Sequence, residues 1–165
     1  MKKALVIFSV LVVISFSGYS QTQNQGDVRF HAFGTYGLRW QNLGVGGGIE
    51  FFFVDNFAFM PSYTQVFPEI GSESNFSADF RYYISEGPSQ LYFMAGYSQN
   101  WENTQPDGAG VRSNFNGANV GLGAYVQLVD WMGLSTEFKF QSTSRQELGF
   151  RIGFAFPLGG RATTN

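Results

Sequence analysis

Residues 147–156 read Glu-Leu-Gly-Phe-Arg-Ile-Gly-Phe-Ala-Phe, and this stretch decides the fold class. Every second residue in it is large and apolar, namely Leu148, Phe150, Ile152, Phe154 and Phe156. The residues between them are charged or small. Because successive side chains of a β-strand point to opposite faces, the stretch predicts a strand with one apolar face and one polar, glycine-rich face.

The same alternation recurs along most of the chain. Leu134, Thr136, Phe138 and Phe140 share one face of the preceding segment, and charged or polar residues share the other. We predict eight strands, at residues 27–36, 43–53, 57–66, 75–84, 90–100, 114–128, 132–141 and 147–156. Most of these segments have the length of a tilted strand that crosses a membrane, about 9–11 residues.

The connections between these segments alternate in length. Tight turns are expected at 54–56, 85–89 and 129–131, whereas longer polar loops are expected at 67–74 and 101–113. Short turns on one side and longer loops on the other are typical of outer-membrane barrels.

The sequence at 48–55 is partly repeated at 123–130, and both stretches end in Val-Asp. We interpret the echo as two equivalent hairpins.

The composition narrows the class of protein further. The chain has 165 residues, of which 13% are charged and 18% aromatic, and this profile favours one ordered domain over a disordered chain. The lack of cysteine excludes disulfides and cysteine-ligated metals. A formal net charge of -2 provides no basic surface for nucleic acid.

The N-terminus has the three parts of a secretory signal peptide. Lys2 and Lys3 precede an apolar run at residues 4–16, which is too short for a membrane-spanning helix, and small residues follow. We predict a signal peptide at 1–20, with cleavage between Ser20 and Gln21. The mature domain is then 21–165, with a short lead at 21–26 and a short tail at 157–165.

Alternation by itself also fits a soluble, lipocalin-like barrel with its apolar face inward. The polar face favours the opposite orientation, because it is rich in small residues such as Gly44, Gly46, Gly48, Ser77 and Gly121 and poor in charge. Its charged residues comprise four acids and four bases: Arg29, Glu50, Asp79, Arg81, Glu137, Lys139, Glu147 and Arg151. Charges enclosed in a narrow lumen must pair. We therefore expect these residues, with His31, to form a lumen network.

Aromatic residues gather near both ends of the segments, as in the girdles of membrane barrels. Phe57, Trp131 and Phe156 lie near the short turns, and Tyr36, Tyr63 and Phe76 lie near the longer loops.

Four residues flank the longest loop and are the expected first contacts for a partner: Tyr97, Trp101, Arg112 and Phe115.

These features together resemble the small outer-membrane β-barrels of the OmpA-transmembrane-domain and OmpX type. The resemblance is one of pattern and covers the whole mature chain. Residues 147–154 look like the C-terminal signal read by the barrel-assembly machinery, although the chain continues past this strand to Asn165. The resemblance implies an eight-stranded antiparallel up-and-down transmembrane barrel in the outer membrane, with both mature termini periplasmic.

The sequence offers little chemistry for catalysis. His31 is the one histidine, and we interpret it as a polar lumen residue rather than a general base. We expect no enzyme activity, cofactor, metal site or nucleic-acid partner. The expected partners are outer-membrane lipid, the assembly machinery and an unidentified extracellular protein or glycan. A structural or surface-interaction role is favoured; the alternatives are a narrow channel, a lipid-modifying enzyme and a soluble periplasmic barrel that binds an apolar ligand.

Overall fold

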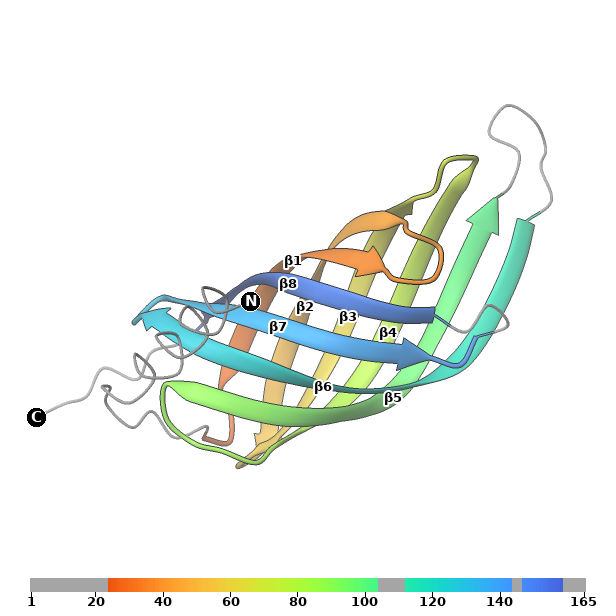
Figure 1. The fold of residues 1–165 in the computed structure, drawn as a ribbon. Helices are drawn as coiled ribbons and strands as arrows, with labels where there is room; N and C mark the ends of the chain where they lie inside the picture. Colours follow the sequence, from red (N-terminus) through yellow and green to blue (C-terminus); the bar gives the residue numbers. More distant parts are fainter. Residues whose placement is uncertain (1–23, 104–111, 144–146, 159–165) are drawn as a thin grey trace, which may run out of the picture.

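The structure is a computed structural model that describes residues 24–103, 112–143 and 147–158. These residues form a closed barrel in which each strand pairs antiparallel with the next and the last pairs with the first (Figure 1). The strands are β1 (Val28–Gly37), β2 (Leu43–Val54), β3 (Phe57–Phe67), β4 (Ser72–Tyr83), β5 (Ser89–Asn103), β6 (Arg112–Val129), β7 (Met132–Gln141) and β8 (Glu147–Pro157). The predicted eight-stranded up-and-down barrel is confirmed. The expected signal peptide, its cleavage site and most of the tail lie outside the described residues.

The strands around the two expected long loops are longer than predicted. β4 begins at Ser72 rather than at residue 75, so that the connection from β3 comprises only residues 68–71. Asn103 at the end of β5 pairs with both Ser72 and Arg112. The ladder therefore continues through polar residues, because backbone pairing does not require apolar side chains. As a result β6 extends beyond β7, whose last residue Gln141 pairs with Asn119 (Figure 1).

The barrel has two distinct ends. We call the end with the tight connections β2–β3, β4–β5 and β6–β7 the turn end, and the opposite one the loop end. Both termini of the described barrel lie at the turn end, where Leu158 N donates a 2.8 Å hydrogen bond to Val28 O and Gly26 N donates a 2.7 Å bond to Phe52 O.

Two hairpins at the turn end have matching irregularities. The register between β2 and β3 shifts between Phe52 and Val54, and that between β6 and β7 shifts between Gln127 and Val129. These positions correspond in the repeated sequence at 48–55 and 123–130, because each pair is offset by the same number of residues. The sequence echo thus reflects two equivalent β-bulges, which sharpen the local twist of each hairpin.

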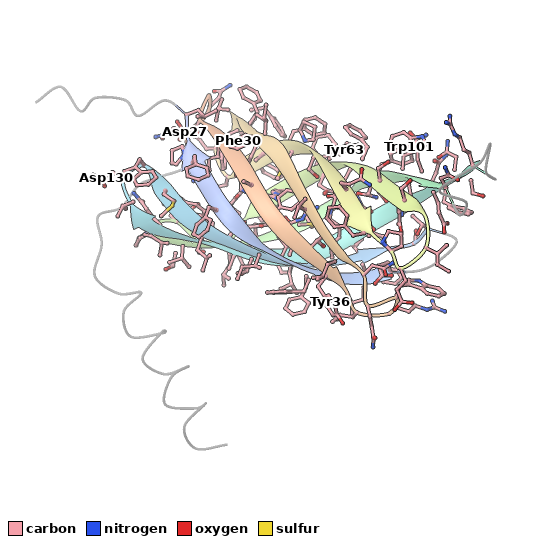
Figure 2. All side chains as sticks on the ribbon, turned by 90° about the horizontal axis from the view of Figure 1, so that it is seen from above. Asp27, Phe30, Tyr36, Tyr63, Trp101 and Asp130 are labelled. Atoms are coloured by element: carbon pink, nitrogen blue, oxygen red, sulfur yellow. The ribbon has the colours of Figure 1, made fainter. Side chains whose placement is uncertain are left out.

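The outer surface of the barrel is apolar. Large hydrophobic side chains on every strand are about half exposed, including Val45 at 55%, Phe80 at 57% and Leu122 at 55%. Figure 2 shows side chains covering the outside of the barrel along its length. Monomeric soluble proteins rarely expose contiguous apolar surface on this scale. The predicted orientation, with the apolar face outward, is confirmed.

Aromatic rings are concentrated at both rims of this surface. At the turn end, Phe156 stacks with Phe30 and Trp131, each at a ring-centroid distance of 6.3 Å. Tyr36, Tyr63 and Trp101 lie toward the loop end, as Figure 2 shows. Such girdles are expected where a barrel meets the two membrane–water interfaces. The described residues contain no helix long and apolar enough to cross a membrane.

Candidate functional site: the barrel lumen

A chain of ion pairs crosses the middle of the lumen and is centred on Arg81. Its Nη1 lies 3.0 Å from Oε1 of Glu50, and its Nη2 lies 2.5 Å from Oε1 of Glu137. The three residues come from β4, β2 and β7, so that the chain connects strands on different sides of the barrel. All three side chains are at most 1% exposed. Charged side chains buried this deeply are stable only when nearly all of them are paired with opposite charges, as they are here.

Glu50 accepts hydrogen bonds from two further side chains. Tyr83 Oη donates a 2.5 Å bond to Oε1, and His31 Nε2 lies 3.1 Å from Oε2. Arg29 lies farther away, with Nη1 at 3.7 Å from Oε2. Its guanidinium instead stacks between aromatic rings, at 4.8 Å from the centroid of Phe52 and 4.2 Å from that of Tyr125. Cation–π contacts therefore compensate Arg29 for the lack of a carboxylate of its own.

Two more ion pairs lie on the side facing the loop end. Arg151 Nη1 is 3.3 Å from Oε2 of Glu137, and Lys139 Nζ is 2.5 Å from Oδ2 of Asp79. Asn119 donates a 2.8 Å hydrogen bond to the other oxygen of Asp79. Each buried carboxylate in the described lumen thus accepts bonds from at least two side chains, which is how buried charges are normally stabilised.

The structure brings together eight of the nine residues expected in the lumen network: Arg29, His31, Glu50, Asp79, Arg81, Glu137, Lys139 and Arg151. All are at most 8% exposed. Glu147 lies apart from them at the loop end, where its Oε1 accepts a 3.2 Å bond from the backbone nitrogen of Arg39. Apart from His31, the described network therefore contains four basic and three acidic side chains, rather than the equal numbers expected from the sequence.

Packed aromatic residues fill the lumen between this network and the turn end. Phe52, Tyr83 and Tyr92 are at most 2% exposed, and their rings contact in series at centroid distances of 5.2 and 4.9 Å. Ala58 and Met94 complete the cluster, and the buried ring of Tyr125 packs on the guanidinium of Arg29. The sequence interpretation missed this cluster because it treated the inward face as small and polar. The sequence does indicate where Tyr92 points. It is an even number of residues away from Gln90 and Ser98 on the same strand, so all three side chains share the inward face.

Inward-facing glycines make room for these rings. A Cβ atom at Gly123 would collide with the ring of Tyr92, and one at Gly133 would collide with the ring of Tyr125. The glycines and the bulky rings are therefore complementary parts of one packing arrangement in a narrow eight-stranded interior. The turn-end half of the lumen is a solid plug.

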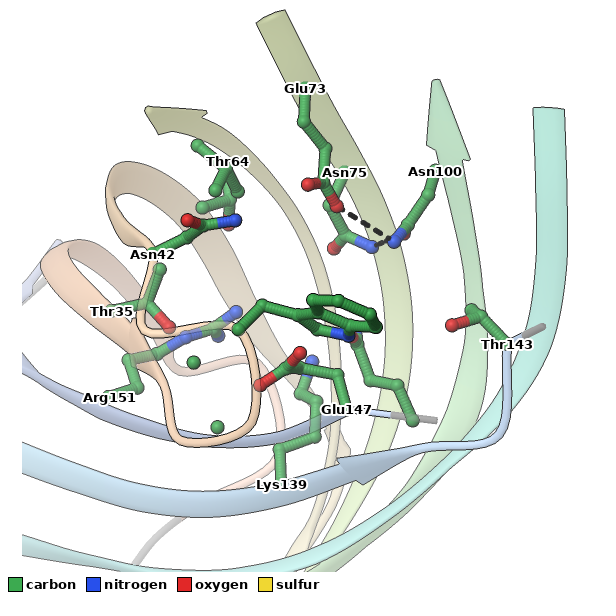
Figure 3. A pocket seen from close by; sticks show the side chains of 15 residues that line it. Thr35, Asn42, Thr64, Glu73, Asn75, Asn100, Lys139, Thr143, Glu147 and Arg151 are labelled. Carbon is green, nitrogen blue, oxygen red and sulfur yellow. Dashed lines mark hydrogen bonds between the residues drawn. The ribbon is translucent and has the colours of Figure 1, made fainter. Parts of the chain in front are cut away.

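The loop-end half of the lumen is hollow. A cavity of about 80 Å³, lined mainly by residues with polar or charged side chains, opens toward the loops, and Lys139 and Arg151 of the ion network form its floor (Figure 3). Its wall includes a chain of side-chain hydrogen bonds, in which Asn75 donates to Asn100 and Asn100 donates to Glu73 at 3.3 Å. Trp40 and Glu147 also line it. The cavity is large enough for several ordered waters, at roughly 10–15 Å³ for each.

The four residues expected to contact a partner do not form one surface. Tyr97 and Trp101 point outward from β5 and are 45% and 40% exposed. Arg112 is exposed at the first residue of β6. Phe115 is paired with Asn100 and so shares the inward face of β6 with Asn119. The described residues contain no cluster of three or more acidic or histidine side chains that could hold a metal ion.

Comparisons with solved structures identify the fold. The N-terminal β-barrel domain of Pseudomonas aeruginosa OprF superposes with a TM-score of 0.72 at 21% sequence identity, over 82% of this chain and 100% of the other. The chain has the fold of a small outer-membrane β-barrel. Pseudomonas aeruginosa OprG matches at a TM-score of 0.61 and 11% identity, over 84% of this chain and 98% of that one.

Other barrels of this size match less closely. Neisserial surface protein A matches at a TM-score of 0.58 and 13% identity, over 79% of this chain and 95% of the other. The attachment invasion locus protein Ail of Yersinia pestis, solved with the heparin analogue sucrose octasulfate, also matches at a TM-score of 0.58, at 13% identity over 81% and 99% of the two chains. No family model and no curated protein matches the sequence.

Proposed function

We propose that the protein is an integral outer-membrane barrel whose lumen is closed and whose loop end presents a surface for interaction outside the cell. The apolar outer surface and its two aromatic rims support insertion in a membrane. The loop end is proposed to face outward and the turn end, with both termini, to face the periplasm. The barrel would serve as a rigid anchor for the loop end, in a structural or surface-interaction role.

The observation that carries this proposal is that the lumen is blocked across its middle and through its turn-end half. The Glu50–Arg81–Glu137 chain crosses the bore, and the Phe52–Tyr83–Tyr92 cluster lies directly behind it. An eight-stranded interior is only wide enough to hold its own side chains. A barrel blocked at two consecutive levels is therefore suited to anchoring rather than to conduction.

The position of the one histidine supports a non-enzymatic role. His31 is 3% exposed and bonded to Glu50 within the blocked section of the lumen. Neither lipid at the outer surface nor solute at the loop end reaches that position. Replacing His31 with alanine is expected to leave the lipid composition of the outer membrane unchanged.

Planar-bilayer recordings test the closed lumen. Wild-type protein whose gel mobility shifts on heating, a sign of an intact barrel, is expected to show no channel openings. The double variant Phe52→Ala/Tyr125→Ala, which removes two rings of the plug but keeps the Arg81 ion pairs, is expected to stay silent, whereas the triple variant Phe52→Ala/Tyr125→Ala/Arg81→Ala, which opens both levels, is expected to show openings. The matched variant Gln141→Ala/Thr143→Ala widens only the cavity and is expected to stay silent. Openings by the folded wild type would contradict the proposal and favour a channel.

A narrow channel is the second candidate, because the loop-end half of the lumen already contains a polar cavity. Conduction would require the ion pairs of Arg81 and the aromatic plug to rearrange together. Buried polar atoms without a partner, such as Ser62 Oγ and Ser98 Oγ, lie in the lumen and provide sites for water along such a path. The same recordings separate the two functions.

Cysteine labelling in intact cells tests the proposed topology. Since the chain has no cysteine, each introduced residue is the single reactive thiol. Glu69→Cys, at an exposed position between β3 and β4, is expected to react with a membrane-impermeant maleimide. Asp55→Cys, exposed in the β2–β3 turn, is expected to react only after the outer membrane is permeabilised. The reverse pattern would invert the topology.

A further inference from the structure

The loop-end cavity contains hydrogen-bonding groups that the protein itself does not use. The side chains of Asn42, Thr64, Gln141 and Thr143 line the cavity, and none of them hydrogen-bonds to another residue in the described part of the chain. Thr64 is only 3% exposed and Thr143 only 2%, so these hydroxyls do not simply face bulk solvent. Figure 3 shows both threonines at the wall of the cavity, where Thr64 lies on β3 and Thr143 follows the end of β7. Buried polar groups normally have partners, and these have room for one.

The charges around the cavity oppose a strongly ionic ligand. Lys139 and Arg151 on the floor are already engaged by Asp79 and Glu137, at 2.5 and 3.3 Å. Glu73 and Glu147 line the cavity as carboxylates, and they would repel an anion. The remaining polar lining consists of uncharged hydroxyls and amides. Such a lining matches a neutral ligand with many hydroxyl groups.

Trp40 adds the one large aromatic ring among the described lining residues. It is 47% exposed and belongs to the β1–β2 connection at the loop end. The guanidinium carbon of Arg39 lies 5.6 Å from the centroid of this ring. An indole ring has two flat apolar faces and a single donor group. Amide and hydroxyl partners next to one aromatic face suit a sugar ring, which has polar edges and a less polar C–H face.

We propose that the loop-end cavity is a saccharide-binding site that takes one sugar ring, either free or at the end of a glycan. The inference deepens the proposed surface-interaction role and rests on the loop end facing outward. The sugar hydroxyls would occupy space that is otherwise large enough for water and would bond to Thr64, Thr143 and Gln141. The aromatic plug and the ion network form a rigid, closed base beneath the ligand, so that the lining is preorganised.

NMR of the folded barrel in a detergent without a sugar headgroup tests this site. The chain contains three tryptophans, and the indole N–H signals are assigned from single Trp→Phe variants. A panel of neutral mono- and disaccharides is expected to shift the Trp40 signal saturably. The signals of Trp101 and Trp131, on the outer surface at opposite ends, are expected to stay in place.

Threonine variants connect the signal to the cavity. Thr64→Val and Thr143→Val retain the shape of the side chain but lose the hydroxyl, and each is expected to weaken binding roughly threefold to tenfold. Thr136→Val is the matched control, because Thr136 lies on the outward face of β7, and its affinity is expected to be unchanged. A heat-dependent gel shift verifies that each variant is folded.

The source of the sugar is resolved by comparing a free monosaccharide with an oligosaccharide that ends in it. Tighter binding of the oligosaccharide would assign the site to glycans, and equal binding would assign it to free sugars. A folded barrel whose Trp40 signal no saccharide shifts at millimolar concentration would overturn the inference, as would a response to glycine or inorganic phosphate in place of sugar. Because barrel folding and topology are measured separately, such a failure leaves the proposed anchoring role intact.

Discussion

The two halves of the lumen differ although the same eight strands enclose both. Toward the turn end, Phe52, Tyr83 and Tyr92 are packed in series against the stacked guanidinium of Arg29. Toward the loop end, threonines and amides surround an open cavity. The Arg81 ion pairs mark the boundary. The strand pairing alone therefore does not determine whether an eight-stranded barrel is filled; the sizes of the inward side chains do.

The two halves are also expected to contribute differently: the turn-end half to the stability of the barrel, and the loop-end half to ligand binding. Rings and ion pairs in the turn-end half contact one another and exclude water, so that changes there must disturb packing or leave charges unpaired. Side chains in the loop-end half face space for water and tolerate change. We expect substitutions in the plug and at the boundary to lower the free energy of unfolding, and matched substitutions in the cavity to alter ligand binding instead.

The largest effect is expected at the boundary, from Arg81→Ala. The change leaves Glu50 and Glu137 without their shared cation, and breaking a buried pair in this way costs about 3–5 kcal/mol. Urea unfolding from lipid vesicles measures this loss. Arg112→Ala, at the exposed start of β6, is the control and is expected to change stability by less than about 0.5 kcal/mol. Equal stability of both variants would show that the boundary charges do not support the fold.

Tyr83→Phe isolates one bond on the plug side of the boundary. It retains the ring that packs between Phe52 and Tyr92, but removes the hydroxyl that donates to Glu50 at 2.5 Å. Hydrogen bonds to charged groups contribute roughly 1.5–3 kcal/mol, and the same unfolding measurement is expected to show a loss of that size. Since the ring remains, planar-bilayer recordings should stay silent. Channel openings in this variant would mean that the bond, rather than the packing, closes the lumen.

A pair of glycine variants compares the two halves directly. Gly123→Ala, in the plug, adds a Cβ that collides with the buried Tyr92 ring. Overpacking of this kind is expected to lower the free energy of unfolding by about 1–3 kcal/mol. At Gly149, in the cavity half, the nearest atom to an added Cβ is 3.7 Å away, an ordinary contact. Gly149→Ala is therefore expected to change the unfolding free energy by about 0.5 kcal/mol or less. If both variants lose the same stability, the plug is no more tightly packed than the cavity.

The sequence predicted the fold because alternation and aromatic placement are local signals that all eight strands repeat. It also indicated the inward face, since residues such as Ser77 and Gly121 occupy every second position. The ends of β4, β5 and β6 were wrong, because strand pairing continues through polar residues outside the apolar band, where alternation no longer marks it.

The division of the lumen into two halves was not predicted, for a physical reason. Whether Gly123 lies opposite a bulky or a small neighbour depends on the register between β5 and β6, which places it beside Tyr92. Strand alternation shows the face on which a residue lies but not its cross-strand partners. Glu147 shows the same limitation of the sequence. Alternation along β8 predicts that it faces inward, but as the first residue of the strand it lies at the rim of the barrel.

The smallest effect on stability is expected from Thr143→Val, which separates the two halves most sharply. The hydroxyl of Thr143 makes no hydrogen bond to a described residue, and it faces a cavity with room for water. Removing the hydroxyl should lower the free energy of unfolding by less than about 0.5 kcal/mol, because a water molecule beside it would lose one hydrogen-bond partner and keep the others. Urea unfolding is expected to match that of the wild type, while saccharide affinity falls. A large loss of stability would show that Thr143 is part of the folded core, and the loop-end half would then have to be regarded as packed structure rather than as a binding site.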